Sequence, residues 1–139
     1  MVFNILSYIE NCPHLSEFVT NVDFLGKNSH SLSLSGRSKD ETVKTYTDGD
    51  SLVKSTYVLK LRLPYGVDMN SNLLNSRLIK SIEEWFTKNS ANGILPELDE
   101  SKIPISIGVK FSRDETVYLA DTAVFSADVA VLYYKTKSL

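Results

Sequence analysis

The first part of the chain carries a helical stripe of apolar residues followed by a run of β-formers. The stripe follows the i, i+3, i+4, i+7 spacing of an amphipathic helix and consists of Val2, Ile5, Leu6 and Ile9. The residue before a proline disfavours helical geometry, so this helix is expected to end at the step from Cys12 to Pro13. The β-formers between residues 18 and 25 predict a strand, which Gly26 closes.

A serine-rich segment from residue 27 to residue 41 predicts a flexible arm. Within this arm the alternation from Ser31 to Ser35 predicts one weak, edge-type strand, because serine and leucine alone specify a register poorly. An idle surface loop is the alternative interpretation of the arm.

Two β-rich runs, residues 43 to 47 and 52 to 63, flank Asp48-Gly49-Asp50, and an Asp-Gly pair in this setting predicts a β-hairpin. The second run alternates strictly, so one face is expected in the core and the other towards solvent or a partner. The residues expected in the core are Val53, Ser55, Tyr57, Leu59, Leu61 and Leu63. Those expected on the outer face include Lys54, Thr56, Lys60 and Arg62.

The second half of the chain predicts a long helix followed by two long strands. Apolar residues at helical spacing predict a helix from about Ser71 to Asn89, anchored on the sheet by Trp85 and stopped by a left-handed Gly93. Alternation predicts a strand over residues 103 to 112, a turn at 113 to 115, and a last strand within residues 116 to 134. The side chains of these strands expected in the core are Ile103, Ile105, Ile107, Val109, Phe111, Ala123, Phe125, Ala127, Val129, Val131 and Tyr133.

The order of helix, strands, helix, strands favours an α+β fold over alternating βαβ units. We expect a mostly antiparallel sheet of about four to six strands with two helices packed on one face. With 139 residues, of which 42% are hydrophobic and 23% charged, residues 1–139 fit one globular domain that carries the arm at about 27–41. Strands this long leave edges that association with other copies can cover.

Charge and cysteine content narrow the possible partners and compartments. Fifteen Lys and Arg against seventeen Asp and Glu give a net charge of -2, which excludes an overall basic footprint for duplex nucleic acid or an anionic membrane. The single cysteine, Cys12, cannot form an intramolecular disulfide, which fits a reducing compartment. The N-terminus has no secretion signal and no segment reaches the ~20 apolar residues of a membrane span, so the expected location is a cytoplasm.

No constellation of residues predicts catalysis, a cofactor or a metal site. His14 and His30 lack the spacing of metal ligands, and a nucleophilic pair of Cys12 with His14 lacks an orienting third group. A calcium loop beginning at Asp48 would need glutamate at its twelfth position, where Leu59 stands. The paired carboxylates lie in predicted turns or on a polar helix face, where solvation explains them: Asp48 and Asp50, Glu83 and Glu84, Asp99 and Glu100, and Asp114 and Glu115.

An ordered set of short sequences resembles a known family. After the N-terminal helix these are Asn11-Cys12-Pro13-His14-Leu15, Asn21-Val22-Asp23-Phe24-Leu25-Gly26, Tyr46-Thr47-Asp48-Gly49-Asp50-Ser51-Leu52, Ile82-Glu83-Glu84-Trp85-Phe86 and Gly93-Ile94-Leu95-Pro96-Glu97-Leu98. In this order, over nearly the whole chain, they resemble the small minor capsid or tail terminator proteins of phages and prophages of Gram-positive bacteria. The segment from Ser29 to Ser38 departs from the family's pattern.

The resemblance implies a structural virion assembly protein without catalysis, which forms a hexameric ring on the finished tail tube. Such a ring ends tube growth and provides the surface that joins the tail to the head. The implied partners are other copies of the chain, the major tail tube protein and head-completion or neck proteins. DNA would pass through the ring without specific binding, which a mildly acidic chain favours. The implied location is the host bacterial cytoplasm during assembly and then the tail-neck region of the virion.

The residues expected to make contacts in such an assembly belong to the hairpin tip, the outer strand face and the arm. They are Asp48, Gly49, Asp50, Lys54, Lys60, Arg62, Ser31, Ser33 and Arg37. One alternative is a head-completion or neck connector subunit. Another is a small-ligand-binding or enzymatic α+β domain, with its site between the second helix and the sheet near Trp85.

Overall fold

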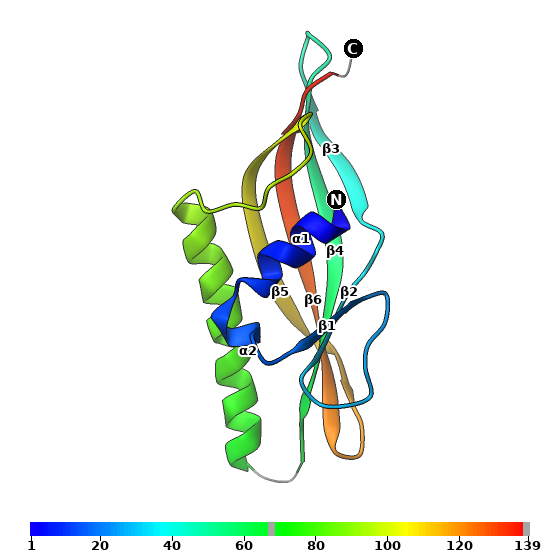
Figure 1. The fold of residues 1–139 in the computed structure, drawn as a ribbon, viewed down its shortest axis with the longest axis vertical. Helices are drawn as coiled ribbons and strands as arrows, with labels where there is room; N and C mark the ends of the chain where they lie inside the picture. The colour runs from blue at the N-terminus through cyan, green and yellow to red at the C-terminus, as the bar shows by residue number, and fades with distance from the viewer. Residues whose placement is uncertain (67–68, 138–139) are drawn as a thin grey trace.

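The computed structural model describes residues 1–66 and 69–137 and shows the expected α+β fold (Figure 1). Its two α-helices accompany a six-stranded, mostly antiparallel sheet. In chain order the elements are α1 (Val2–Glu10), the 3-10 helix η1 (Pro13–Leu15), β1 (Val19–Val22), β2 (Ser31–Leu34), β3 (Lys39–Thr45), β4 (Ser51–Pro64), α2 (Met69–Ala91), β5 (Lys102–Tyr118) and β6 (Thr122–Lys135).

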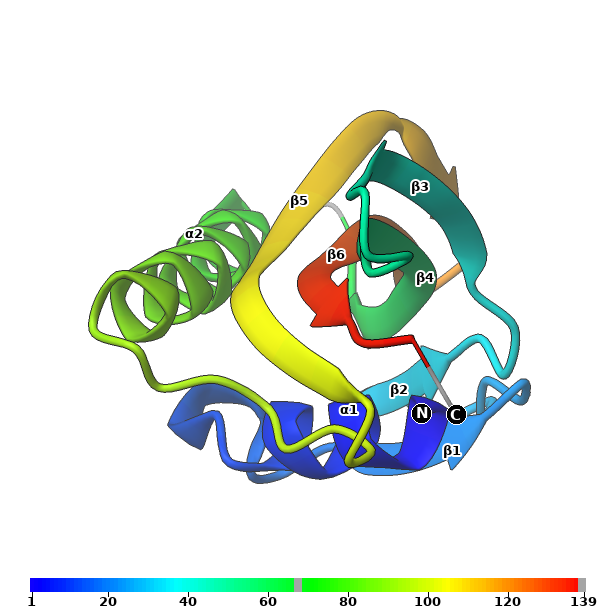
Figure 2. The same cartoon turned by 90° about the horizontal axis from the view of Figure 1, so that it is seen from above.

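A long central ribbon of β4 and β6 organises the sheet. These strands pair without interruption from Ser51 opposite Lys135 to Pro64 opposite Thr122. The strand order is β1-β2-β4-β6-β5, and β3 also pairs with β4, so that β2 and β3 share one edge of β4 in succession. Among the strands of the described residues, only β1 and β2 pair in parallel. Seen along the long axis, the sheet curls strongly around this ribbon (Figure 2).

Both helices bury their apolar stripes in the same core as the ribbon. Ile5 and Ile9 of α1 are inaccessible to solvent, as are Ile82 and Phe86 of α2, and all four belong to the cluster that contains Leu59 and Leu61 of β4. Helix α2 runs beside β5, whereas α1 crosses the open side of the curled sheet (Figures 1 and 2). The Tyr8 ring joins the helices, because its centroid lies 5.5 Å from that of Trp85 and 5.8 Å from that of Phe86.

The predicted turns at Gly49 and Gly93 are confirmed. Gly49 has a φ of +93° at the β3–β4 hairpin, and Gly93 has a φ of +74° just after α2. At the second turn the Ile94 amide donates to the carbonyl of Asn89 at 2.8 Å, a hydrogen bond typical of a left-handed helix end. A glycine is favoured at both positions because a Cβ penalises this backbone conformation.

The predicted edge position of the strand in the arm at residues 27–41 is wrong, whereas the flexibility of the arm stays a prediction. Strand β2 lies inside the sheet, between β1 and β4, and residues 39 to 45 form β3. The physical reason is that Leu32 and Leu34 pair opposite Leu61 and Leu59 and reach the core, where both are fully buried. This burial compensates for a register that the flanking serines specify poorly.

The charged triplet 113–115 does not turn the chain. Strand β5 continues through it, and the turn comes later, where the Leu119 amide donates to the carbonyl of Thr122 at 2.8 Å. Ser112 pairs with Ser126 and Val117 pairs with Val124, so residues 113 to 116 lie opposite Phe125 alone. An irregularity within one strand therefore accommodates the charged residues.

A second irregularity changes which residues of β5 face the core. Pro104 pairs with Tyr133 and Ser106 with Leu132, which leaves Ile105 as an extra residue. Ile103 and Ile105 are 53% and 45% exposed, against the prediction, whereas Ile107 and Val109 beyond the bulge are buried as predicted. The alternation expected on β4 is confirmed, because its predicted core residues after Leu52 are all buried.

Phe86 and Ile82 anchor α2, in place of the predicted Trp85. Both are inaccessible, while Trp85 is half-buried and packs edge-on against Phe86 with centroids 5.0 Å apart. Trp85 therefore covers the anchor and does not itself form it.

Replacement of Phe86 by alanine is expected to lower the free energy of unfolding by about 3–5 kcal/mol, the range for a buried aromatic residue. Trp85→Ala should cost less, because part of that ring already contacts solvent. Urea denaturation measures both, with Leu74→Ala as the control, since Leu74 is 62% exposed and should change stability by only about 0.5 kcal/mol. A larger loss for Trp85→Ala than for Phe86→Ala would contradict this assignment.

Candidate interaction surface

The predicted hairpin tip lies at one extreme end of the molecule (Figure 1). Asp48 and Gly49 are exposed there. The turn is held by the Tyr46 amide donating to the carbonyl of Asp50 at 2.8 Å and by the Gly49 amide donating to the carbonyl of Tyr46 at 3.0 Å. The Asp50 amide donates to Asp48 Oδ1 at 3.0 Å. The tip is thus an ordered projection that exposes Asp48 and Gly49, with the Lys137 side chain packed beside Gly49.

Asp50 fastens this tip to the end of β6. The Tyr134 hydroxyl donates to Asp50 Oδ2 at 2.5 Å, and the Lys137 amide donates to Oδ1 at 2.7 Å. The bond from Tyr134, followed by that from Lys137, lowers the pKa of Asp50, and the same contact raises the pKa of Tyr134 to about 12. Both carboxylate oxygens of Asp50 accept hydrogen bonds from Tyr134 and Lys137 of the same chain. Of the three predicted tip residues, Asp48 and Gly49 are therefore the ones that remain candidates for contacts with a partner.

Three further predicted contact residues are used or buried within the chain. Arg62 is half-buried and donates from Nε to the Gly26 carbonyl at 2.8 Å and from Nη1 to Thr122 Oγ1 at 3.1 Å. Ser31 and Ser33 are buried between the neighbouring strands, because β2 is an internal strand. Among these further residues, Lys54 and Lys60 on β4 and Arg37 before β3 are exposed as expected. The prediction of a surface contact is therefore wrong for Ser31 and Ser33. Arg62 instead joins parts of the same chain through its hydrogen bonds to Gly26 and Thr122.

The middle of the β5 edge is covered by side chains of α2. The Phe111 amide donates to Glu83 Oε2 at 3.0 Å, and the Ile107 amide donates to Ser90 Oγ at 3.2 Å. A strand edge whose amides are satisfied in this way cannot template another strand. The helix therefore divides the edge of β5 into a covered middle and two uncovered ends.

Exposed apolar residues mark the uncovered parts of the sheet edges. Ile103 and Ile105 lie at the start of β5, near the hairpin end. Val43 is the unpaired residue of a bulge on β3, a strand in which every residue is exposed. Val117, Tyr118 and Leu119 are exposed at the far end of β5. Sequence reasoning missed the β5 residues because strict alternation conceals a bulge that turns side chains outward.

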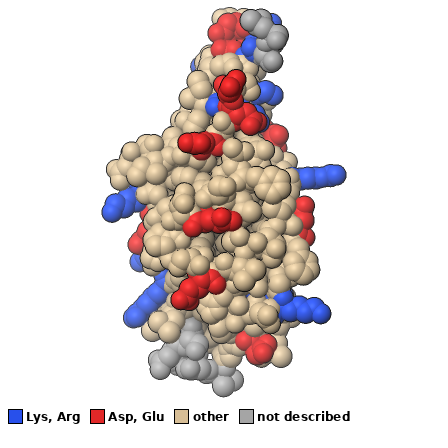
Figure 3. Space-filling model, in the orientation of Figure 1, with Lys and Arg blue, Asp and Glu red and all other residues tan. Residues whose placement is uncertain are grey.

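Charged side chains are dispersed over the face shown in Figure 3, with acidic groups along its middle and basic groups projecting at its margins. Over residues 1–66 and 69–137, His, Cys, Asp and Glu form no group of three or more that could hold a metal. Burial raises the pKa of the Cys12 thiol, which disfavours a nucleophilic thiolate. Neither helix, in its described part, combines the length and apolar character needed to cross a membrane.

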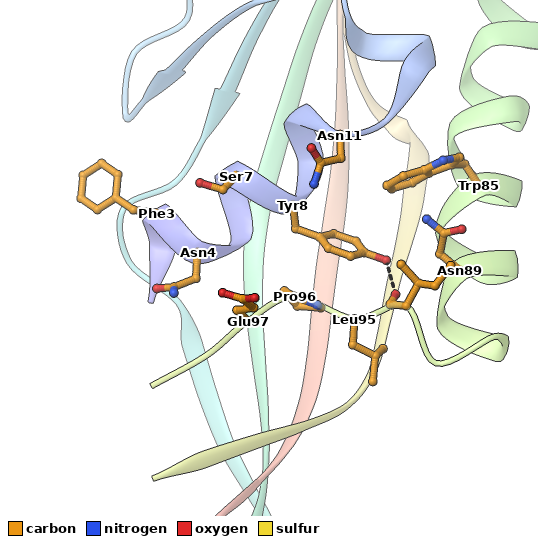
Figure 4. Close-up of a pocket in the computed structure, with 11 residues that line it drawn as sticks. Phe3, Asn4, Ser7, Tyr8, Asn11, Trp85, Asn89, Leu95, Pro96 and Glu97 are labelled. Atoms are coloured by element: carbon orange, nitrogen blue, oxygen red, sulfur yellow. Dashed lines mark hydrogen bonds between the residues drawn. The ribbon is translucent and has the colours of Figure 1, made fainter. Parts of the chain in front are cut away.

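A cavity of about 520 Å³ lies beside Trp85, between α1 and the segment that follows α2 (Figure 4). The Tyr8 side chain points into this region, and its hydroxyl donates to the Ile94 carbonyl at 2.6 Å. The ligand-site alternative placed a pocket between the second helix and the sheet. The cavity near Trp85 lies between the two helices instead, and the Tyr8 hydroxyl in its wall is already hydrogen-bonded.

Tyr134→Phe should reduce stability at neutral pH, with the loss fading at both pH extremes. The folded-state pKa of Asp50 lies below the unfolded value of ~3.9, so its contact stabilises the fold above that pH and is lost as the pH falls through the folded value. The pKa of Tyr134 is raised to about 12, so the contact persists beyond the ordinary ~10 of tyrosine and disappears as the pH rises through the folded value.

Urea unfolding of wild type and Tyr134→Phe at about pH 7, 2.5 and 11.5 measures this dependence. Tyr46→Phe is the matched control, because its ring lies 5.6 Å from that of Tyr134 but no hydrogen bond joins its hydroxyl to Asp50 in the described residues. A stability difference for Tyr134→Phe that stays constant across these pH values would refute the role of the Asp50 contact.

Comparison with known proteins assigns no relationship to this chain. A scan against models of protein families finds no match. A search of curated proteins likewise finds no significantly similar sequence.

Proposed function

We propose that this protein is a tail terminator, a structural protein that closes the end of a phage tail tube as a ring of identical copies. The resemblance of its ordered short sequences to that family supports the identity. The observation that carries the assembly step is the pair of apolar bulges on opposite edges of the sheet, Val43 on β3 and Ile103 with Ile105 on β5. The tail terminator role thus needs no reactive group.

Two different edges suit a ring. A ring requires a heterologous contact, in which one patch of a subunit meets a different patch of the next. Strand β3 lies on one side of β4, and β5 ends the sheet on the opposite side of β6. Apposition of the β3 edge of one copy with the first residues of β5 in the next would bury Val43 against Ile103 and Ile105. The covered middle of β5 would separate this contact from the uncovered far end of the strand.

The two ends of the molecule also differ, as a connector between unlike partners requires. One end carries the hairpin tip with Asp48 and Gly49, and the other exposes Tyr118 and Leu119 beside the β5–β6 turn. A ring built from parallel copies would therefore have two chemically different rims, one with the acidic hairpin tip and the other with Tyr118 and Leu119 beside the exposed Asp121. Such a ring would bind the tail tube through one rim and the neck proteins through the other.

The purified chain is expected to form a closed ring, detected by native mass spectrometry and light scattering, and to cap tubes polymerised from the tail tube protein. Val43→Asp and Ile105→Asp should each weaken self-association by about tenfold or more, since charge at an interface centre is costly. Leu74→Asp on α2 is the matched control, because Leu74 is also an exposed apolar residue but lies outside the proposed contact.

Mixing the two variants tests the heterologous geometry. Each variant keeps one intact edge, so a mixture should give dimers that cannot close. Urea unfolding verifies that each variant is folded. A wild-type monomer that neither self-associates nor caps tubes would refute the proposal, and binding to a portal complex in preference to the tube would assign the chain to the neck connector alternative.

A further inference from the structure

A second cavity, of about 710 Å³, lies between the N-terminal half of α2 and the distal part of β5. One stripe of α2 forms its wall, since Asn72, Asn75, Ser76, Lys80 and Glu83 recur at helical spacing along it. Asn75 fixes this wall to the end of β4, because its Nδ2 donates to the Pro64 carbonyl at 2.5 Å. The volume lies within the range of small-molecule sites.

Three cations surround this cavity. Arg77 and Lys80 come from α2, and Arg113 comes from the irregular segment of β5. Within residues 1–66 and 69–137, no carboxylate approaches these cations to salt-bridge distance. Among the described residues that line the cavity, the acidic one is Glu83, which accepts the Phe111 amide through Oε2. The lining thus carries an excess of positive charge in a chain whose net charge is -2.

Aromatic rings form the opposite side. Tyr65 and Tyr118 lie with centroids 4.7 Å apart at an angle of 49°, and the Tyr65 amide is fixed by donating to the Asp121 carbonyl at 3.0 Å. Tyr118 is 59% exposed, so a ring face is available to a flat ligand. Phe111 and Phe125 are partly buried in the cavity lining.

We propose that this cavity binds a nucleotide, with its phosphate held by Arg77, Lys80 and Arg113 and its base stacked against Tyr118. Arginine guanidinium groups favour phosphate oxygens, and aromatic side chains stack on every base. By contrast, the described residues that line the cavity beside Trp85 include no Lys or Arg and have Glu97 as their charged member. The nucleotide proposal does not rest on the tail terminator role, although Tyr118 also lies at the end of the molecule that forms one rim of the proposed ring. The size of the cavity admits a mononucleotide or one unit of a single strand but excludes a duplex.

Isothermal titration of the purified full-length chain at low salt tests the site with four probes: ATP, adenosine, inorganic triphosphate and a short single-stranded oligothymidylate. ATP should bind at least tenfold more tightly than either adenosine or triphosphate, because only ATP fills both halves of the cavity. The oligonucleotide distinguishes the source of the ligand. Tighter binding of the oligonucleotide than of ATP would identify a single-strand site, and weaker binding a free-nucleotide site, both within the proposal.

Paired variants separate site contacts from general charge. Arg77→Ala with Arg113→Ala should weaken ATP binding by about tenfold or more, whereas Lys88→Ala with Lys110→Ala, which removes two exposed cations from the same elements, should change it by less than about twofold. Tyr118→Ala should weaken ATP binding but leave triphosphate binding unchanged, with Leu119→Ala as the control.

Absence of ATP binding, equal binding of ATP and triphosphate, or equal effects of the two cation pairs would overturn the proposal. Displacement of ATP by an acidic peptide at equal or lower concentration would also overturn it, because the cavity would then recognise charge without the base. Ring formation is measured separately, so failure here leaves the tail terminator proposal standing.

Discussion

The structure depends on the continuous pairing of β4 with β6. This ribbon brings the inward side chains of both strands, from Val53 to Leu63 and from Ala123 to Tyr133, onto one face, where they meet both helices. The other strands join the sheet through this ribbon: β2 and β3 pair with β4, β1 pairs with β2, and β5 pairs with β6. A one-residue slip would transfer the whole apolar set to the outer face, so the buried leucines fix the register.

The fold class could be predicted from the sequence because its signals are local. The stripes of α1 and α2, the Asp48-Gly49 hairpin and the alternation on β4 all depend on spacing between near neighbours. The failures have nonlocal causes. Leu32 and Leu34 form an internal strand only because β4 lies opposite, and the bulge at Ile105 depends on the register with β6. Nothing in the sequence near either feature indicates that partner.

The candidate site was predictable to the same limited extent. The exposed tip residues Asp48 and Gly49 follow from turn chemistry, but the internal roles of Asp50 and Arg62 need partners far along the chain, Tyr134 and Thr122. Similarly, Arg77 and Lys80 of α2 line the same cavity as Arg113 only because the helix packs along β5. A polar residue on an outward face is therefore an ambiguous signal, since a distant strand decides whether it meets solvent or another part of the same molecule.

The separation in sequence between the two ribbon strands has a consequence during synthesis. Ser51 at the start of β4 pairs with Lys135 at the end of β6. The ribosome must therefore synthesise α2 and β5 before β6, the principal partner of β4, is available. Long-range pairing of this kind slows folding. Until β6 is available, the leucines of β4 are exposed, and the incomplete chain is prone to aggregate with other nascent chains. Protection of β4 from aggregation until β6 has been synthesised is thus a requirement of this strand order.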